Sequence, residues 1–229
     1  MSTRYEIAER LEIVKARIGA AAHRARRDPA SIRLVLASKT QTPEAIRAAY
    51  EAGARDFGEN YVQEAIGKRP ALADLGEIRW HLIGHLQTNK ARIAAAAFML
   101  IHTIDSIRVA EALARARPSP KVRALIEVNL GAEASKTDVA AGEVEAILEA
   151  VRDKIQIDGL MTIPPPAPRA EAARSYFERL RRLRDRLAIG SGLALSELSM
   201  GMTDDFEVAI EEGATIVRIG RAVFGERTT

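Results

Sequence analysis

The feature that most constrains the fold is a repeated alternation of short apolar runs with amphipathic segments. The apolar runs have the composition of buried strands, and they lie at 33–38, 54–57, 79–83, 98–102, 122–129, 156–160, 195–199 and 215–219. Apolar residues at helical spacing predict helices at 3–27, 43–53, 59–68, 87–96, 106–117, 138–153, 168–188 and 204–213. Eight strands that alternate with helices predict parallel β-α-β units.

The length of the repeat separates two α/β architectures. The 229 residues divided over eight units average a little under 30 residues each, which is the rhythm of a (β/α)₈ TIM barrel. A doubly wound sheet is the alternative, and it normally carries a glycine-rich turn after its first strand. Residues 37–43 read ASKTQTP, without glycine. No linker or repeat divides the chain, so we expect one barrel domain over residues 1–229.

Composition excludes several classes of function. Lys and Arg number 34 against 31 Asp and Glu, and a scattered net charge of +3 does not indicate a nucleic-acid partner. The absence of cysteine excludes disulfides, thiolate metal sites and a cysteine nucleophile. The polar N-terminus and the shortness of the apolar runs predict neither a signal peptide nor a membrane span. A cytoplasmic protein is expected.

Lys39 is the first candidate for chemistry, because it follows the first predicted strand. In barrels of this type the carboxyl ends of the strands carry the active site. An amine at such a mouth is partly desolvated, which favours its neutral form. A neutral lysine can condense with a carbonyl to form a Schiff base, whereas arginine stays protonated. The alternative is a loop lysine in open solvent, and by placement alone that is the commoner outcome.

The turns after the last two predicted strands have the character of an anion site. Ser199 and Gly201 follow the seventh strand, and Gly220 and Arg221 follow the eighth and open a short helix at 221–224. Small residues in such turns leave backbone N–H groups accessible, and barrels frequently bind phosphate at this place. Ordinary helix capping is the alternative, since Asp204 followed by Glu207 matches a capping box.

Arg218 lies within the eighth predicted strand, between apolar neighbours. If it faces the barrel interior it requires a partner, because an unpaired buried charge is costly. A ring nitrogen of a ligand could serve, and so could a carboxylate of another strand, such as Glu127. The sequence leaves both open.

The histidines do not indicate a metal site. His81 and His85 are four residues apart, but they lie in a strand pattern interrupted by Gly84, and no third ligand or H-E-x-x-H motif accompanies them. The chain also lacks a G-x-S-x-G elbow and a P-loop. A barrel hydrolase therefore has no support beyond the fold.

A lysine after the first strand and a phosphate cradle after the last two together suggest pyridoxal 5′-phosphate. At this point the chain closely resembles the pyridoxal phosphate homeostasis protein family, also called the YggS/PROSC family. The resemblance spans nearly the full chain. It rests on LVLASKTQTPEAIRAAYEAGARDFGENYVQEA, IRWHLIGHLQTNK, EVNLGAEASKTD, GLMTIP and LSMGMTDDFEVAIEEGATIVRIGRAVFGER, in the order of the family.

The resemblance implies a fold and a set of site residues. The fold is the barrel of the alanine-racemase N-terminal domain (PLP fold type III) as a single domain. Lys39 matches the lysine that forms the Schiff base, Asn60 lies near the cofactor ring, and Arg218 faces the pyridine nitrogen. The phosphate-binding turns are formed by Ser199, Met200, Gly201, Gly220 and Arg221. One departure concerns Arg221, because the family commonly has a threonine there.

The implied function is a carrier or regulator that maintains the intracellular level of pyridoxal 5′-phosphate, with apo-forms of PLP enzymes as partners and no established turnover. The alternative is a PLP-dependent racemase-like enzyme. An arginine at the pyridine nitrogen weakens the ring as an electron sink, and racemisation requires a second base, which related racemases take from a domain missing here. That domain also pairs racemase subunits, so we expect a monomer.

Overall fold

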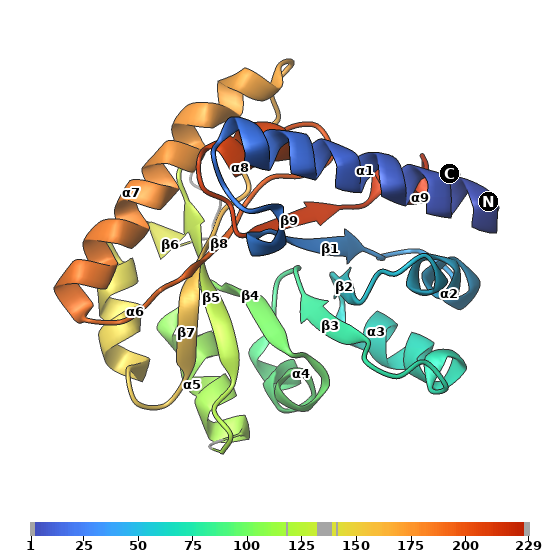
Figure 1. The fold of residues 1–229 in the computed structure, drawn as a ribbon. Coiled ribbons are helices and arrows are strands. Elements are labelled where there is room, and N and C mark those ends of the chain that lie inside the picture. Colours follow the sequence, from blue (N-terminus) through green and yellow to red (C-terminus); the bar gives the residue numbers. More distant parts are fainter. Residues whose placement is uncertain (1–2, 118, 132–138, 141, 227–229) are drawn as a thin grey trace.

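The strands form one parallel sheet that closes on itself (Figure 1). The structure is a computed structural model and describes residues 3–117, 119–131, 139–140 and 142–226. Within these ranges the strands are β1 (Arg33–Ala37), β2 (Asp56–Glu59), β3 (Arg79–Leu82), β4 (Leu100–Ile104), β5 (Arg123–Asn129), β6 (Val139–Ala140), β7 (Gln156–Met161), β8 (Glu197–Ser199) and β9 (Ile216–Ile219). Their order is β4-β3-β2-β1-β9-β8-β7-β5, and β4 also pairs with β5. This pairing closes a barrel of eight parallel strands.

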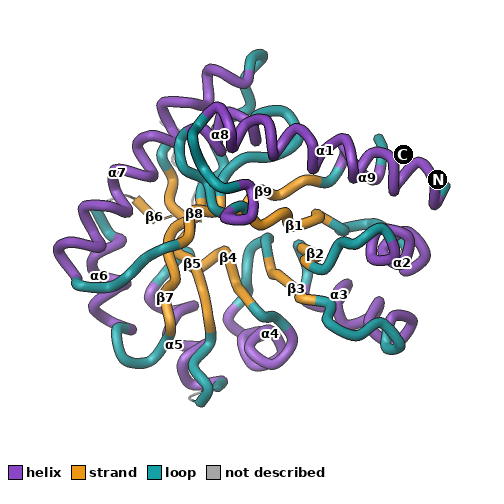
Figure 2. The backbone as a smooth tube through the Cα atoms, in the orientation of Figure 1, coloured by secondary structure: helices purple, strands orange, loops and turns teal. Residues whose placement is uncertain are grey.

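Helices cover the outside of the barrel, as the tube in Figure 2 shows. In the described ranges they are α1 (Arg4–Arg24), α2 (Pro43–Glu51), α3 (Val62–Lys68), α4 (Ala91–Ala97), α5 (Ile107–Ala116), α6 (Val144–Val151), α7 (Arg174–Ser191), α8 (Phe206–Glu211) and α9 (Arg221–Phe224). Short 3₁₀ helices lie at Pro29–Ser31, Arg69–Leu72, Thr88–Lys90 and Ala170–Ala173. Helix α1 precedes β1 and contacts α2, α8 and α9.

The barrel prediction is confirmed, and the doubly wound alternative is wrong. All eight predicted strands are present, with boundaries shifted by at most two residues. The two-residue strand β6 was not predicted; it pairs only with the end of β5. Within the predicted 168–188 helix, apolar spacing indicates a face of Ala172, Tyr176, Leu180, Leu183 and Leu187. The α-helix begins only at Arg174, and its buried side chains are those of Phe177, Leu180, Leu183 and Leu187.

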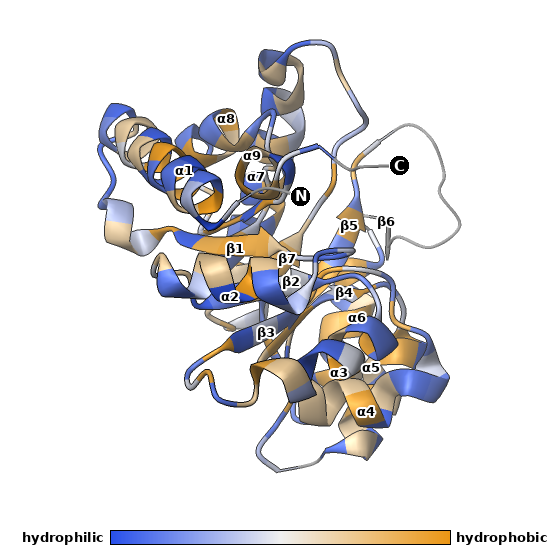
Figure 3. Ribbon diagram, turned by 90° about the vertical axis from the view of Figure 1, so that its right-hand side faces the viewer, coloured by the Kyte–Doolittle hydropathy of each residue, from blue (hydrophilic) through white to orange (hydrophobic). Residues whose placement is uncertain are grey.

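Strand alternation builds two apolar layers. One lies between the strands and the helices and contains most of the core. The other fills the barrel itself with the fully buried side chains of Val35, Leu100, Leu125, Met161 and Ile216. Figure 3 shows the apolar residues (orange) on strands such as β1 and the polar residues (blue) on the outer sides of the helices. The barrel interior is therefore a packed core, and polar groups can occupy it only as satisfied networks.

None of the helices in the described ranges has the length and apolar character that crossing a bilayer requires.

Candidate functional site

A cavity of about 400 Å³ opens at the carboxyl ends of the strands. Five of the eight predicted site residues line it: Lys39, Asn60, Arg218, Gly220 and Arg221. They come from the ends of β1 and β2, from β9, and from the start of α9. The loop after β8 contributes Met202, Thr203 and Asp204 to the same wall. Residues far apart in the sequence therefore meet where a barrel places its active site.

Lys39 lies on the cavity wall and is half-buried, in place of the open-solvent position that was the alternative. Val35 and Ala37 on the same strand precede it on the inner face, so alternation directs Lys39 inward. Among the described residues, no hydrogen bond or ion pair engages its amine. The Lys39 amine is thus accessible to a ligand in the cavity.

The turn around Lys39 is held from outside the barrel by four side chains, which we call the Lys68 cluster: Ser38, Glu59, Glu64 and Lys68. The buried ammonium of Lys68 donates to Glu59 Oε1 (2.9 Å), to Glu64 Oε1 (2.6 Å) and to the carbonyl of Ser38 (2.8 Å). The Ser38 hydroxyl donates to Glu59 Oε1 (2.7 Å). Burial raises the pKa of Glu59, and the hydrogen bonds from Ser38 and Lys68 oppose that rise.

The cluster also stabilises an unusual backbone conformation at Thr40. This residue has φ +64°, which β-branched side chains rarely adopt, and its N–H donates to Glu64 Oε1 (2.5 Å). On the neighbouring strand end, Gly84 allows close packing against Asn60, since a Cβ on Gly84 would lie 2.4 Å from the Asn60 carbonyl oxygen. Hydrogen bonds and close packing therefore restrict the backbone around Lys39 and Asn60 to one conformation.

Arg218 combines burial with access to the cavity. Its relative exposure is 4%, and it donates from Nη1 to Ser199 Oγ (2.6 Å) and from Nη2 to the carbonyl of Thr162 (3.0 Å). Burial lowers its pKa to about 10, while the charges of Glu127 and Asp205 act in the opposite direction. Arg218 is therefore a cation at neutral pH, which makes it a permanent donor at the cavity floor.

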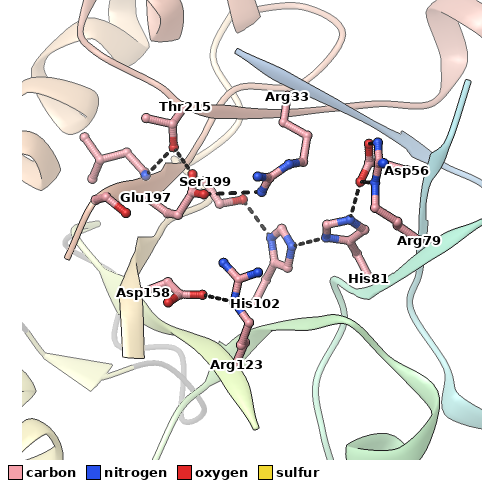
Figure 4. A network of polar contacts seen from close by, with 12 residues as sticks. Arg33, Asp56, Arg79, His81, His102, Arg123, Asp158, Glu197, Ser199 and Thr215 are labelled. Atoms are coloured by element: carbon pink, nitrogen blue, oxygen red, sulfur yellow. Dashed lines mark hydrogen bonds and ion pairs between the residues drawn. The ribbon is translucent and has the colours of Figure 1, made fainter. Parts of the chain in front are cut away.

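A line of hydrogen bonds runs from Arg218 through the barrel interior, and Figure 4 shows its part from Ser199 to Asp56 and Arg79. Ser199 Oγ lies 2.8 Å from His102 Nδ1, and His102 Nε2 lies 3.0 Å from His81 Nδ1. His81 Nε2 lies 2.9 Å from Asp56 Oδ1, and Asp56 also accepts from Arg79. Sequence reasoning missed this network. Strand alternation directs the side chains of His81 and His102, on adjacent strands, into the barrel. That they meet Ser199 there follows only from the barrel geometry.

The two histidines predict a loss of stability in acid. Burial lowers the pKa of both, that of His102 strongly. As the pH falls below ~6.5, the unfolded chain therefore takes up protons that the folded chain does not, and the free energy of unfolding decreases. We expect a loss of up to about 1.4 kcal/mol per histidine between pH ~7.5 and ~5.5, measured by urea unfolding. A His23→Gln variant, at an exposed position, should keep this loss; a flat profile would contradict the prediction.

The remaining predicted residues, Ser199, Met200 and Gly201, lie beneath the cavity wall. Ser199 and Met200 are completely buried, the latter in the apolar layer outside the strands. The turn that follows them reaches the cavity at Met202, and it is joined to the other predicted turn by a hydrogen bond from the Ala222 N–H to Thr203 Oγ1 (3.5 Å). The two turns predicted for phosphate are therefore neighbours.

Gly201→Ala should destabilise the protein by about 2 kcal/mol or more. Gly201 has φ +92°, and an added Cβ would lie 2.6 Å from Ala209 Cβ and 2.9 Å from Phe206 Cα. Backbone strain and the clash with α8 therefore add. Gly192→Ala is the matched control in urea unfolding, because Gly192 has φ +70° with nothing within 4 Å of the added Cβ, so it should cost only about 1 kcal/mol. Equal losses in both variants would rule out the clash.

Arg221 is paired with carboxylates at the cavity rim. Its Nη2 lies 2.5 Å from Asp204 Oδ2, and its Nε lies 3.4 Å from Glu226 Oε1. The expected capping box at Asp204 is wrong. The N-cap of α8 is Asp205, whose carboxylate accepts from the N–H of Met202 (2.6 Å), and Asp204 is an exposed partner of Arg221.

The exposed histidine at the end of β3 contacts a carboxylate. His85 Nδ1 lies 2.7 Å from Asp105 Oδ2. In the part of the chain that the structure describes, no three or more His, Cys, Asp or Glu side chains gather closely enough to hold a metal ion.

Residues 11–228 match the family described as alanine racemase, N-terminal domain. A protein of Pseudomonas aeruginosa named pyridoxal phosphate homeostasis protein is 46% identical over 225 residues, covering 96% of each chain. Proteins of the same name from Aquifex aeolicus and Escherichia coli are 46% and 42% identical, with coverage of 96% or more.

Solved structures give a consistent result. PipY of Synechococcus elongatus with PLP bound is 38% identical, with a TM-score of 0.86 over 96% of this chain and 100% of that one. The PLP-free form of PipY has a TM-score of 0.85. Alanine racemase from Corynebacterium glutamicum shares the fold at 18% identity, with a TM-score of 0.73 over 98% of this chain and 61% of the racemase.

Proposed function

The chain belongs to the pyridoxal phosphate homeostasis protein family, and we propose that it binds pyridoxal 5′-phosphate in the cavity at the carboxyl ends of the strands. The observation that carries the proposal is the shared cavity of Lys39 and Arg218, which places an amine with no partner among the described residues beside a buried permanent donor. The barrel formed by residues 1–229 is the cofactor-binding unit, and the PLP-bound structure of PipY supports this choice of ligand.

The residues present fit this cofactor. A volume of about 400 Å³ lies within the usual range of small-molecule sites. The cofactor carries an aldehyde, a ring nitrogen and a phosphate, and the cavity offers an amine, a guanidinium donor and a second cation at Arg221. Gly220 allows the start of α9 to pack closely against the end of β1, since a Cβ there would lie 3.2 Å from the Ala37 carbonyl oxygen.

Each residue then has a role. When bound, the cofactor supplies an aldehyde that condenses with a primary amine and releases one water molecule. Lys39 provides that amine and Asn60 contacts the ring. Arg218 donates to the ring nitrogen, which keeps that nitrogen unprotonated. The phosphate is held at the two adjacent turns, by Gly220 and Arg221 on the cavity wall, while Ser199, Met200 and Gly201 support the other turn from beneath that wall.

We propose a carrier and not a catalyst. The names of the relatives support homeostasis, and an unprotonated ring nitrogen is a poor electron sink for racemisation. A monomer in the cytoplasm, with apo-forms of PLP enzymes as acceptors, belongs to the same proposal. A racemase-like enzyme is the competing outcome.

The test separates carrier from enzyme. Purified protein is loaded with pyridoxal 5′-phosphate, and transfer is followed by the activity gained by an added apo-enzyme. In parallel, small amino acids are incubated in D₂O and their α-protons are followed by NMR. We expect cofactor transfer without α-deuteration at turnover rates. Rapid deuteration of the α-carbon would show that the protein is an enzyme and not a carrier. Failure to bind the cofactor would contradict the proposed function altogether.

A further inference from the structure

The hydrogen-bonded line between Arg218 and Asp56 has ends of opposite character. Arg218 can only donate, and the ionised carboxylate of Asp56 can only accept. The side chains of Ser199, His102 and His81 lie between these ends and are all completely buried. The line therefore extends from the cavity floor to the amino end of the barrel, where Asp56 borders a second, polar hollow beside Arg33 and Arg79.

The two ends determine the position of every proton between them. Because Asp56 accepts, His81 must carry its proton on Nε2, and in a neutral ring Nδ1 is then an acceptor. His102 must therefore donate from Nε2 to His81, which leaves its Nδ1 to accept from the Ser199 hydroxyl. Ser199 in turn accepts from Arg218 Nη1. In each of the four hydrogen bonds the donor is therefore the group nearer Arg218 and the acceptor is the group nearer Asp56.

We propose that Asp56, His81 and His102 are positioning residues that fix the direction of this hydrogen-bonded line and thereby hold Arg218 as an oriented donor toward the cavity. Arg218 has no freedom to rotate without breaking its bond to Ser199, whose own proton is already committed to His102. Hydrogen bonds that point the same way polarise and strengthen one another. The Asp56 carboxylate is thus the acceptor end of the line that begins at the buried guanidinium.

The surroundings of the line favour this arrangement. Arg79 donates twice to Asp56, at 2.8 and 2.6 Å, and the pKa of Asp56 is lowered to about 2 by its hydrogen bonds and charges despite its burial. Burial lowers the pKa of both rings and outweighs the opposite effect of Asp56 on His81; the charges of Arg33 and Arg79 act with burial on His81, and those of Arg218 and Arg33 act with it on His102. Both rings therefore stay neutral, as a line with one direction requires.

The decisive variant is Asp56→Asn. The amide is isosteric but can donate, so His81 and His102 are free to move their protons to Nδ1 and reverse the line. Asp158→Asn is the matched control, since Asp158 is a buried carboxylate that accepts from Arg123 Nε at 2.8 Å, as Asp56 does from Arg79, without contacting a histidine.

The first measurement needs no ligand. In ¹⁵N-histidine-labelled protein, ring nitrogen resonances separate protonated from unprotonated nitrogens. We expect Nε2–H on both His81 and His102 in the wild-type protein and in Asp158→Asn, and a change toward Nδ1–H in Asp56→Asn. An Nδ1–H on either ring of the wild-type protein overturns the inference whether or not the variant folds. Unchanged rings in Asp56→Asn overturn it as well.

The second measurement rests on the proposed function and uses pyridoxal 5′-phosphate as the probe. Asp56→Asn should bind it about tenfold more weakly, the loss expected when a hydrogen bond to a charged group is misdirected, and Asp158→Asn should match the wild-type protein. Equal affinity of all three with altered rings in Asp56→Asn contradicts the positioning role. If the wild-type protein does not bind the probe, the proposed function fails, and the ring resonances still decide the direction of the line.

Discussion

Lys39→Ala should yield a folded protein that forms no covalent link with pyridoxal 5′-phosphate. The side chain lies on the cavity wall and holds no protein group in place among the described residues, so its removal should cost little stability. Its amine is the proposed attachment point, and alanine offers no nucleophile. The measurement is the visible absorbance band of the lysine-bound cofactor, together with the mass of the protein after borohydride reduction. Both signals should disappear.

Two control variants sharpen this result. Lys39→Arg keeps a long cationic side chain that stays protonated and should also lose the band, which separates nucleophilicity from charge. Lys136, in the segment EVNLGAEASKTD quoted for the family resemblance, is a second lysine to test; it lies outside the described residues, and Lys136→Ala should retain the band. An undiminished band in Lys39→Ala that is lost instead in Lys136→Ala would show that Lys39 is not the attachment point.

Gly159→Ala should be among the most destabilising single substitutions in the barrel. Gly159 on β7 pairs with Glu197 on β8, and an added Cβ would lie 1.8 Å from the Glu197 carbonyl oxygen and 2.9 Å from its backbone nitrogen. The obstacle is backbone, which cannot rotate away, so the two strands would have to separate. We expect a loss of at least about 3 kcal/mol in the free energy of unfolding, measured by urea denaturation, or failure to accumulate as folded protein.

Gly19→Ala is the matched control for that substitution. Gly19 lies within α1, and nothing is within 4 Å of its added Cβ. Alanine should therefore stabilise the helix by about 0.5–1 kcal/mol. If Gly159→Ala behaved like Gly19→Ala, the close β7–β8 pairing would be incorrect.

The barrel could be predicted because each of its strands and helices can be identified from a single short stretch of the sequence. Each apolar run is long enough for one strand, and each amphipathic segment is long enough for one covering helix. Lys39 was predictable for the same reason, since its place after the first strand follows from counting along one element. Side-chain alternation from Val35 to Lys39 then directs it inward without reference to any other part of the chain.

The hydrogen-bonded line could not be predicted in this way. His102 and Ser199 are 97 residues apart and belong to strands that are not neighbours in the sheet, so they meet only across the barrel interior. The ion pair of Arg221 could not be predicted from the sequence either, because it depends on the conformations of side chains at the cavity rim. Asp204 was misread because capping boxes are defined by spacing alone, and the turn after β8 places Asp205 at the N-cap.

The Lys68 cluster has a consequence for the thermodynamics of ligand capture. With Ser38 and Thr40 anchored to carboxylates, the main chain flanking Lys39 is already ordered before any ligand arrives. The entropy lost on attachment would then come mainly from the rotamers of one lysine, on the order of 2 kcal/mol, and no loop closure would add to it. Because the turn around Lys39 is already ordered, neither binding nor release has to wait for the chain to refold around the ligand.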